Sequence, residues 1–451
     1  MNESPQHVTQ WCDGLRLNRF HMSLLILAGL TLIFDGYDMM VIAYAMPQIM
    51  KEWHLSPVKL GSVASYGYAG LMIGTVALGM IADRIGRKKT LILALSVFST
   101  FSGAAYFAPT FSVFCVLRFL AGLGIGGVLP LTITLVSEYA PAKIRAKAVT
   151  SVFAGFSLGW VLAAVVAMAV IPVFGWRALL LMGFLPIFLV PALAAYLPES
   201  VRFLVSKGRY DDAVKEIRRV EKAARVAPFN WTQKTLVAPA VEGTGSIRDL
   251  FSPKLIIMTI LVWMTYLLAI MSSTGFLFWV PTLLVQAGFS MVRSYSYSAV
   301  QSIGAALGPF LIGASMDRFG RKIGLVITCV LGGISIWLFG NVGSYLAVFV
   351  IMAAVGLFQL GAPTCLHVVA GEIYPTRIRS TAIGSALTFG RIGSIIAPIL
   401  GGLLQMAGLT TKQFFLVFSV PCFVCAFLVL MYRVNVKDQA LETITARLTA
   451  E

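Results

Sequence analysis

Long apolar runs follow one another along the chain, separated by short polar segments. Each has about the 20 residues that a helix needs to cross the core of a bilayer. The twelve runs are 23–49, 58–80, 90–108, 112–136, 148–171, 178–197, 255–284, 295–315, 323–342, 345–369, 380–404 and 413–432. Because lipid offers the backbone no hydrogen-bond partners, we expect each run to form a helix. The alternating pattern of a membrane β-barrel is missing, so the predicted fold class is an all-α membrane protein with twelve transmembrane helices.

The chain repeats itself at an offset of 234 residues. Asp83–Lys88 matches Asp317–Lys322, and the segment Glu138–Arg145 matches Glu372–Arg379 at several positions. Each copy holds six apolar runs, which predicts two pseudo-symmetric six-helix bundles, residues 1–197 and 255–451. Residues 198–254 carry 11 Lys+Arg and no long apolar run, as expected of a cytoplasmic linker, and residues 210–225 have the pattern of an amphipathic surface helix. Duplicated halves are typical of transporters that open a central site to one side of the membrane at a time.

Composition and charge agree with a membrane protein. Only 12% of the residues are charged and 58% are hydrophobic, whereas soluble domains are about 25% charged. This excludes a soluble enzyme. The net charge of +16 would suggest a nucleic-acid partner in a soluble protein. With a cytoplasmic N-terminus, however, 28 of the 35 Lys+Arg fall on the cytoplasmic side and five outside. This satisfies the positive-inside rule, so we predict two cytoplasmic termini and no nucleic-acid partner.

Short motifs near the runs resemble those of the major facilitator superfamily. Gly79-x-x-x-Asp83-Arg84-x-Gly86-Arg87-Lys88 resembles the signature loop between its second and third helices, and residues 313–322 repeat it. Residues 118–127 and 198–203 resemble two further motifs of that superfamily. Within the superfamily, Asp35-Gly36-Tyr37-Asp38 is similar to the aromatic acid:proton symporter family, and residues 44–53 are similar to its benzoate-type members.

The resemblance implies the import of a benzoate-like or hydroxybenzoate-like carboxylate with a proton, across the bacterial inner membrane, by alternating access. Transporters of other organic ions, nicotinate or sugars share several of these features, and a proton-coupled exporter is a further alternative. Drug exporters of the superfamily usually have Gly-Pro where this chain has Gly159-Trp160, which favours import. We expect a monomer that is not an enzyme, with no catalytic residue, metal site or cofactor.

Four charged residues lie deep inside the apolar runs, where each costs about 2.5–3.5 kcal/mol on insertion scales. Asp35 and Asp38 share one helix face, and counting residues puts Asp38 level with Arg118 and Asp35 level with Arg391. Two structural ion pairs are one interpretation. Our hypothesis is that Asp38 pairs with Arg118, that Asp35 and Asp38 couple the proton, and that Arg391 binds a carboxylate, which matches its planar fork. Arg118 is a second candidate for substrate binding.

Other polar and aromatic side chains are weaker candidates, because the same residue types also pack membrane helices. The candidates for substrate contact are Tyr37, Tyr68, Trp160, Phe276, Trp279, Gln301, Phe358 and Gln359. His367, near the cytoplasmic end of the tenth run, is a candidate proton relay. An ordinary hydrogen bond at a helix end is the alternative for this histidine.

The repeated loops carry a different expectation. The family resemblance implies a lock between the halves that opens in each cycle, and positive-inside anchoring alone does not explain Asp83 or Gly79. Glu138 with Arg145, and Glu372 with Arg379, are expected to join the same network. The predicted gating residues are Gly79, Asp83, Arg84, Arg87, Glu138, Arg145, Asp317, Arg318, Arg321, Glu372 and Arg379.

Overall fold

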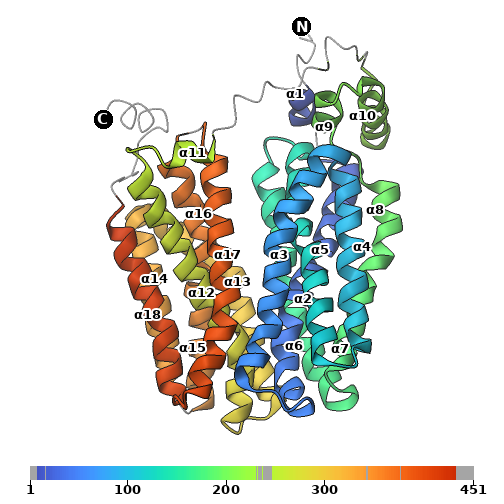
Figure 1. The fold of residues 1–451 in the computed structure, drawn as a ribbon. Helices are drawn as coiled ribbons and strands as arrows, with labels where there is room; N and C mark the ends of the chain where they lie inside the picture. The colour runs from blue at the N-terminus through green and yellow to red at the C-terminus, as the bar shows by residue number, and fades with distance from the viewer. Residues whose placement is uncertain are drawn as a thin grey trace. The chain divides into compact units, whose positions relative to one another are not determined.

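The computed structural model describes residues 8–15, 17–229, 231, 236, 246–341, 344–375 and 377–432, and Figure 1 shows that helices dominate its fold. Within these ranges, twelve helical segments are long and apolar enough to cross a membrane. Each predicted run falls on one of them, with ends that agree within a few residues. The prediction of twelve spans is therefore confirmed.

The spans of the first repeat are α2 (Arg19–Glu52), α3 (Pro57–Ile85), α4 (Arg87–Ala104) with η1 (Ala105–Phe107), α5 (Phe111–Tyr139), α6 (Arg145–Phe174), and α7 (Arg177–Leu181) continued by η2 (Met182–Leu189) and α8 (Val190–Tyr196). Those of the second are α12 (Ile256–Gln286), α13 (Met291–Phe319), α14 (Arg321–Phe339), α15 (Tyr345–Ala354) continued by η3 (Val355–Leu360) and α16 (Ala362–Ile373), α17 (Arg379–Met406) and α18 (Thr411–Leu430). Here η1 and η2 are 3₁₀ helices and η3 is a π-helical stretch.

Four shorter helices lie outside the spans: α1 (Val8–Gly14), α9 (Val201–Ser206), α10 (Tyr210–Ala224) and α11 (Ile247–Leu250). The prediction of an amphipathic helix at residues 210–225 is confirmed by α10. It buries Ala213, Ile217 and Val220, whose spacing of four and three residues makes one helix face. The other three helices have four to seven residues, too few for a periodic pattern to reveal them.

The chain forms two compact units. Unit 1 contains Met1–Met39, Ala69–Trp160 and Arg177–Ala240, and unit 2 contains Met40–Tyr68, Val161–Trp176 and Val241–Glu451. The boundaries of the units run through α2, α3 and α6. The division of the chain at residues 197 and 255, made from the repeat, stays a prediction.

Glycines bring the helices of unit 1 to backbone contact. A Cβ on Gly36 of α2 would lie 2.1 Å from the Phe156 carbonyl oxygen of α6, and one on Gly159 of α6 would lie 2.2 Å from the Ile33 carbonyl oxygen of α2. Likewise α4 and α5 run side by side in Figure 1, and a Cβ on Gly124 would lie 2.5 Å from the Phe98 nitrogen. Small residues in membrane helices allow this close packing.

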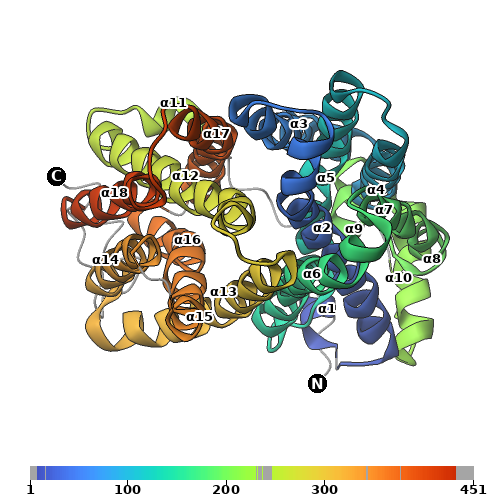
Figure 2. The ribbon, with the colours of Figure 1, turned by 90° about the horizontal axis from the view of Figure 1, so that it is seen from below.

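Unit 2 is built around α12, which packs against α17 and α18 (Figure 2). Trp279 of α12 is fully buried, and its indole N–H donates to the Pro398 carbonyl of α17 at 3.1 Å. The first part of α3 also belongs to unit 2. There the Ser65 hydroxyl donates to the Ile395 carbonyl at 2.6 Å, and a Cβ on Gly61 would lie 2.2 Å from the Pro398 oxygen.

Candidate functional site

Asp38 and Arg118 form a closed ion pair inside unit 1. Arg118 Nη2 donates to Asp38 Oδ2 at 2.8 Å and Nη1 donates to Oδ1 at 3.0 Å, which is the bidentate geometry of a strong pair. The side chain of Arg118 is 6% exposed and that of Asp38 is 2% exposed. Ser102 of α4 completes the cluster, because its hydroxyl donates to Asp38 Oδ1 and accepts from Arg118 Nη1 at 3.4 Å. The predicted pairing is thus present, while its role in transport stays a prediction.

Asp35 lies one helix turn before Asp38 and is 1% exposed. Between them, the buried Tyr37 donates its hydroxyl to the Leu179 carbonyl of α7 at 3.1 Å, so this ring fastens α2 to α7. Trp160 of α6 is half-buried, and its indole N–H has no hydrogen-bond partner in the part of the chain that the structure describes. Because Tyr37 fastens this part of α2 to α7, Asp35 and Asp38 are held within the helix bundle.

Arg391 is a half-buried arginine of α17 in unit 2. Residues four and seven positions further along the helix, Ile395 and Pro398, present their carbonyl oxygens to Ser65 and Gly61 of α3. Such spacing puts all three residues of α17 on one face. Arg391 therefore lies on the α3-facing side of α17, one turn beyond the contact with α3.

His367 of α16 is half-buried. Its Nδ1 atom lies 2.5 Å from the carbonyl oxygen of Pro363, four residues earlier in the chain. This is the ordinary hydrogen bond at a helix end that was the alternative for this histidine. Its ring also meets the edge of the Tyr266 ring, with the centroids 5.5 Å apart. Sequence reasoning missed Tyr266, because a tyrosine in an apolar run carries no sign of its neighbours.

The remaining predicted substrate contacts occupy different environments in unit 2. Phe276 is fully buried among the rings of Phe339 and Phe415. Gln359, in η3, accepts from the Cys422 thiol at 3.2 Å and is buried. Tyr68 packs edge-on against Phe278, and Phe358 is half-buried. Phe276, Gln359 and Tyr68 thus contact residues of other helices. The assignment of all four residues to the substrate stays a prediction, as does that of Trp279.

Gln301 of α13 differs from the other candidates of unit 2. Its side chain is 0% exposed, and neither its amide oxygen nor its amide nitrogen has a hydrogen-bond partner among the described residues. A buried polar group left unsatisfied costs about 1–3 kcal/mol. A ligand with a group that both donates and accepts would satisfy both amide atoms.

The loop between α3 and α4 is held by a buried acid. Gly86 caps α4 with φ 105° and ψ 159°. Glu199 Oε1 accepts from the backbone N–H of Lys88 at 3.0 Å and of Ser200 at 2.9 Å, so this carboxylate lies at the N-terminus of α4, where a negative charge is stabilised. Gly79 is exposed, with no atom within 4 Å of a Cβ built on it. Sequence reasoning assigned no role to Glu199, although it noted the motif.

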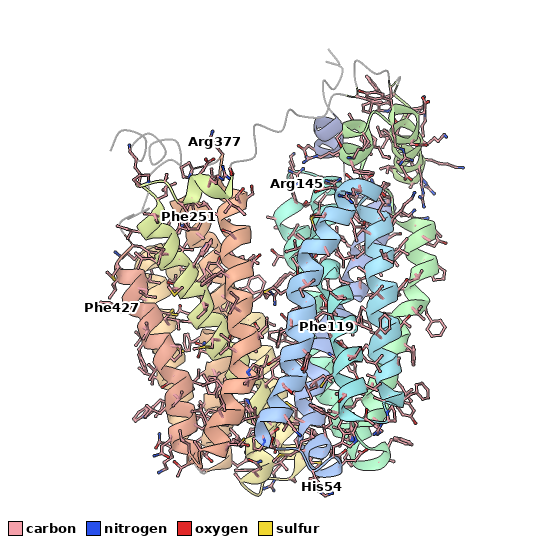
Figure 3. The ribbon with its side chains drawn as sticks, in the orientation of Figure 1. His54, Phe119, Arg145, Phe251, Arg377 and Phe427 are labelled. Atoms are coloured by element: carbon pink, nitrogen blue, oxygen red, sulfur yellow. The ribbon has the colours of Figure 1, made fainter. Side chains whose placement is uncertain are left out.

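Predicted gating residues of unit 1 take several partners. Arg87 pairs with Asp83 at 3.5 Å, and both Asp83 and Arg84 are exposed. Arg145, which Figure 3 labels, pairs with Asp13 of α1 rather than with Glu138. Glu138 is half-buried, near the charges of Arg87 and Arg202.

Unit 2 repeats part of this arrangement. Lys322 donates to the Tyr432 carbonyl at 2.8 Å, as Lys88 of unit 1 donates to the Ala194 carbonyl at 2.8 Å. Arg321 pairs with Glu372. Arg318 is exposed, with its guanidinium 5.5 Å from the Phe319 ring, and Arg379 begins α17 half-buried. The side chain of Asp317 lies outside the described residues.

A short helix before the first span of each repeat carries a paired aspartate. In unit 1 this is Asp13 of α1, which binds Arg145. In unit 2 it is Asp249 of α11, which accepts from Arg377 at 2.9 Å, at the end where Figure 3 also labels Phe251. Sequence reasoning missed both pairs. Within the ranges described, no cluster of three or more His, Cys, Asp or Glu side chains could hold a metal ion.

Comparison with known proteins gives a consistent family. The family model described as "Sugar (and other) transporter" matches residues 24–448. The niacin transporter NiaP of Acinetobacter baylyi is 32% identical over 433 residues, which cover 96% of this chain and 98% of that protein. The gallate transporter of Pseudomonas putida is 33% identical, covering 95% of each chain, and the benzoate transport protein of A. baylyi is 32% identical, covering 92% and 90%.

Solved structures agree on the fold. A crystal structure of a D-xylose-proton symporter superposes with a TM-score of 0.73 at 18% identity, covering 93% of this chain and 99% of that one. The inward-open xylose transporter of Escherichia coli gives a TM-score of 0.72, covering 95% and 99%. This chain therefore belongs to the sugar (and other) transporter family of the major facilitator superfamily and is a multi-pass membrane transporter, not an enzyme.

Proposed function

We propose that this chain is a symporter that imports an aromatic carboxylate with a proton, by alternating access, across the bacterial inner membrane, with both termini in the cytoplasm. The observation that carries the proposal is the distribution of buried charge. In unit 1, Asp38 and Arg118 neutralise each other in a closed pair. In unit 2, Arg391 is a half-buried arginine of α17, and an arginine within a membrane span is a candidate for binding an anion.

The substrate class is supported by the relatives. Benzoate, gallate and niacin each combine an aromatic ring with a carboxylate, and transporters named for them are 32%, 33% and 32% identical to this chain. The guanidinium of Arg391 can bind a carboxylate through two parallel hydrogen bonds. Gln301 is suited to a hydroxyl substituent on the ring, because its buried amide offers both a donor and an acceptor.

Asp38 and Asp35 are the proposed proton carriers. A proton on Asp38 would remove the charge that binds Arg118 and so loosen the contact of α2 with α5. An anion that enters with a proton adds no net charge to the buried site, which avoids the cost of an isolated charge in the membrane. His367 of α16 remains a candidate relay.

Nicotinate is a second candidate within the same class. The niacin transporter NiaP matches 96% of this chain, and niacin is also an aromatic carboxylate. Its pyridine nitrogen accepts a hydrogen bond but donates none, so it would satisfy only one amide atom of Gln301. Competition between nicotinate and hydroxybenzoates for uptake separates the two.

A substrate screen in proteoliposomes tests the proposal. The external pH is set below the internal pH. Uptake by the wild type, Arg391→Ala and Arg293→Ala is then measured for labelled benzoate, 4-hydroxybenzoate, gallate, gentisate and nicotinate. We expect accumulation of at least one aromatic acid, lost in Arg391→Ala and kept in Arg293→Ala, because Arg293 is exposed beside the Tyr345 ring at the start of another helix.

Three results would contradict parts of the proposal. Wild-type uptake by Arg391→Ala would refute the assignment of the carboxylate to Arg391. Failure of every aromatic acid would refute the substrate class without affecting the fold. Loss of substrate from preloaded vesicles against its gradient, driven by the pH gradient, would favour an exporter.

A further inference from the structure

Ser102 is the third member of the cluster that holds Asp38. It lies on α4, is 1% exposed, and approaches the ion pair from a helix that carries neither of the two charged residues. Its hydroxyl donates to Asp38 Oδ1, and its oxygen accepts from Arg118 Nη1 at 3.4 Å. Ser102 therefore contacts the acid and the base at the same time.

These two contacts fix the direction of the Ser102 O–H bond. With its oxygen turned to the guanidinium, its hydrogen is directed at Asp38 Oδ1. That orientation complements an ionised carboxylate, which only accepts hydrogen bonds. A hydrogen bond to a charged partner is about twice as strong as a bond between neutral groups. Ser102 therefore favours the ionised form of Asp38 over the neutral form.

Ser99, one turn earlier on α4, provides a comparison. Its hydroxyl is 0% exposed, donates to the Gly183 carbonyl at 2.7 Å and accepts from the Ile187 N–H at 3.0 Å. Both contacts go to the 3₁₀ helix η2 and support its irregular backbone. The two serines lie on the same helix, both are buried and each makes two hydrogen bonds, but only Ser102 bonds to the ion pair.

The other titratable groups around Asp38 come from few elements. On α2 itself they are Asp35 and Tyr37. From α5 come Arg118 and, one turn earlier, the buried Cys115. In α7, Arg177 donates to the Tyr106 and Ala108 carbonyls at 3.1 and 3.0 Å. The sequences of α4 between Thr90 and Ala104, and of α6 between Ala148 and Phe174, contain no titratable side chain.

We propose that Ser102 is a positioning residue for the proton step, which holds Asp38 in its ionised, Arg118-bound form and thereby sets the pH at which Asp38 takes up the transported proton. This inference rests on the proposed function, in which Asp38 carries that proton. On protonation, the carboxyl gains a hydrogen and loses the charge that binds Arg118. The Ser102 hydroxyl then has a weaker partner, so its contribution opposes protonation.

The test is the pH profile of uptake by the reconstituted full-length protein. The initial rate of labelled benzoate uptake is measured as the external pH is varied at fixed internal pH, with protein-free liposomes subtracted. Ser102→Ala removes a bond that favours the ionised carboxylate, so the midpoint of the profile should rise by about one pH unit. Ser102→Thr keeps the hydroxyl and should keep the wild-type midpoint, as should Ser99→Ala.

A second variant covers the case in which Ser102→Ala does not fold. Ser102→Cys keeps the size of the side chain, and its thiol is a weaker donor than a hydroxyl. Its midpoint should move in the same direction by a smaller amount. Infrared difference spectra, which detect the carboxyl that is missing in Asp38→Asn, should show the same order of midpoints without depending on transport.

The outcomes separate this inference from the function on which it rests. If Asp38→Asn abolishes the pH dependence but Ser102→Ala keeps the wild-type midpoint, the role of Ser102 is refuted and the proton step stands. An equal shift in Ser99→Ala would also refute it, because the effect would then come from the packing of α4. Wild-type pH dependence in Asp38→Asn would overturn both the role of Ser102 and the assignment of the transported proton to Asp38.

Discussion

Replacing Gly86 by alanine should destabilise unit 1, because both the backbone and a neighbouring carboxylate require glycine there. Its φ of 105° and ψ of 159° lie in a region that is essentially restricted to glycine. A Cβ would also lie 2.2 Å from Glu199 Oε2 and 3.0 Å from the Phe203 ring. Glu199 cannot yield freely, since its other oxygen accepts from the Lys88 N–H at the start of α4.

The expected cost follows from these two terms. A non-glycine residue in this region costs about 1–3 kcal/mol, and displacing Glu199 from the end of α4 costs about 1 kcal/mol more, as for a lost N-cap. The sum is about 2–4 kcal/mol. Gly79→Ala in the same motif is the matched control. Gly79 lies within α3 in open space, so alanine should be neutral or stabilise the helix by up to about 1 kcal/mol.

The assay is denaturant unfolding of the purified variants in one detergent, with uptake measured in parallel. Gly86→Ala should unfold at lower denaturant than the wild type, and Gly79→Ala at the same or higher denaturant. Wild-type stability of Gly86→Ala would refute the requirement for glycine at this position. A stable Gly79→Ala that does not transport would support the gating role predicted for that residue.

The ion pair, the buried amide of Gln301 and the thiol of Cys12 can each be tested by substitution. Arg118→Met should lower the free energy of unfolding by about 3–5 kcal/mol, because it leaves Asp38 buried without its partner. In unfolding assays the double variant with Asp38→Asn should recover part of this loss, and a double variant no more stable than Arg118→Met would contradict the prediction. Gln301→Leu should reduce uptake of 4-hydroxybenzoate more than that of benzoate, and equal losses would exclude a contact with the ring hydroxyl. Burial raises the pKa of the Cys12 thiol to about 12. This thiol should therefore stay protonated and resist maleimide at neutral pH in the wild type, whereas Asp13→Ala should release α1 and allow labelling. Equal labelling of the two proteins, measured by mass spectrometry, would argue against the Asp13–Arg145 ion pair as the anchor of α1.

The spans could be predicted from the sequence because an apolar run of this length has one backbone solution in lipid. The irregular segments within the spans could not. The 3₁₀ geometry of η2 is supported by Ser99, whose bonds to Gly183 and Ile187 appear only once α4 packs against it. The π-helical stretch η3, which carries Gln359, likewise depends on neighbours distant in sequence, such as Cys422.

In the charged site, too, one part of the arrangement could be predicted from the sequence and another part could not. Depth along straight helices brings Asp38 to the level of Arg118, so counting residues was enough to pair them. Ser102 could not be assigned in this way, because hydroxyls in membrane helices often bond to the carbonyl four residues earlier, as Thr31 bonds to Leu27 and Thr75 to Leu71. Which partner a serine takes depends on the packing of other helices.

Symport requires that an aromatic carboxylate and a proton enter together. The most direct measurement adds gallate or benzoate to proteoliposomes that contain a pH-sensitive dye and no imposed pH gradient, and records substrate entry and internal pH at once. We expect saturable entry with acidification of the lumen beyond that of protein-free liposomes, and we expect Asp38→Asn to lose both. Protein-dependent entry of the substrate without extra acidification would contradict symport.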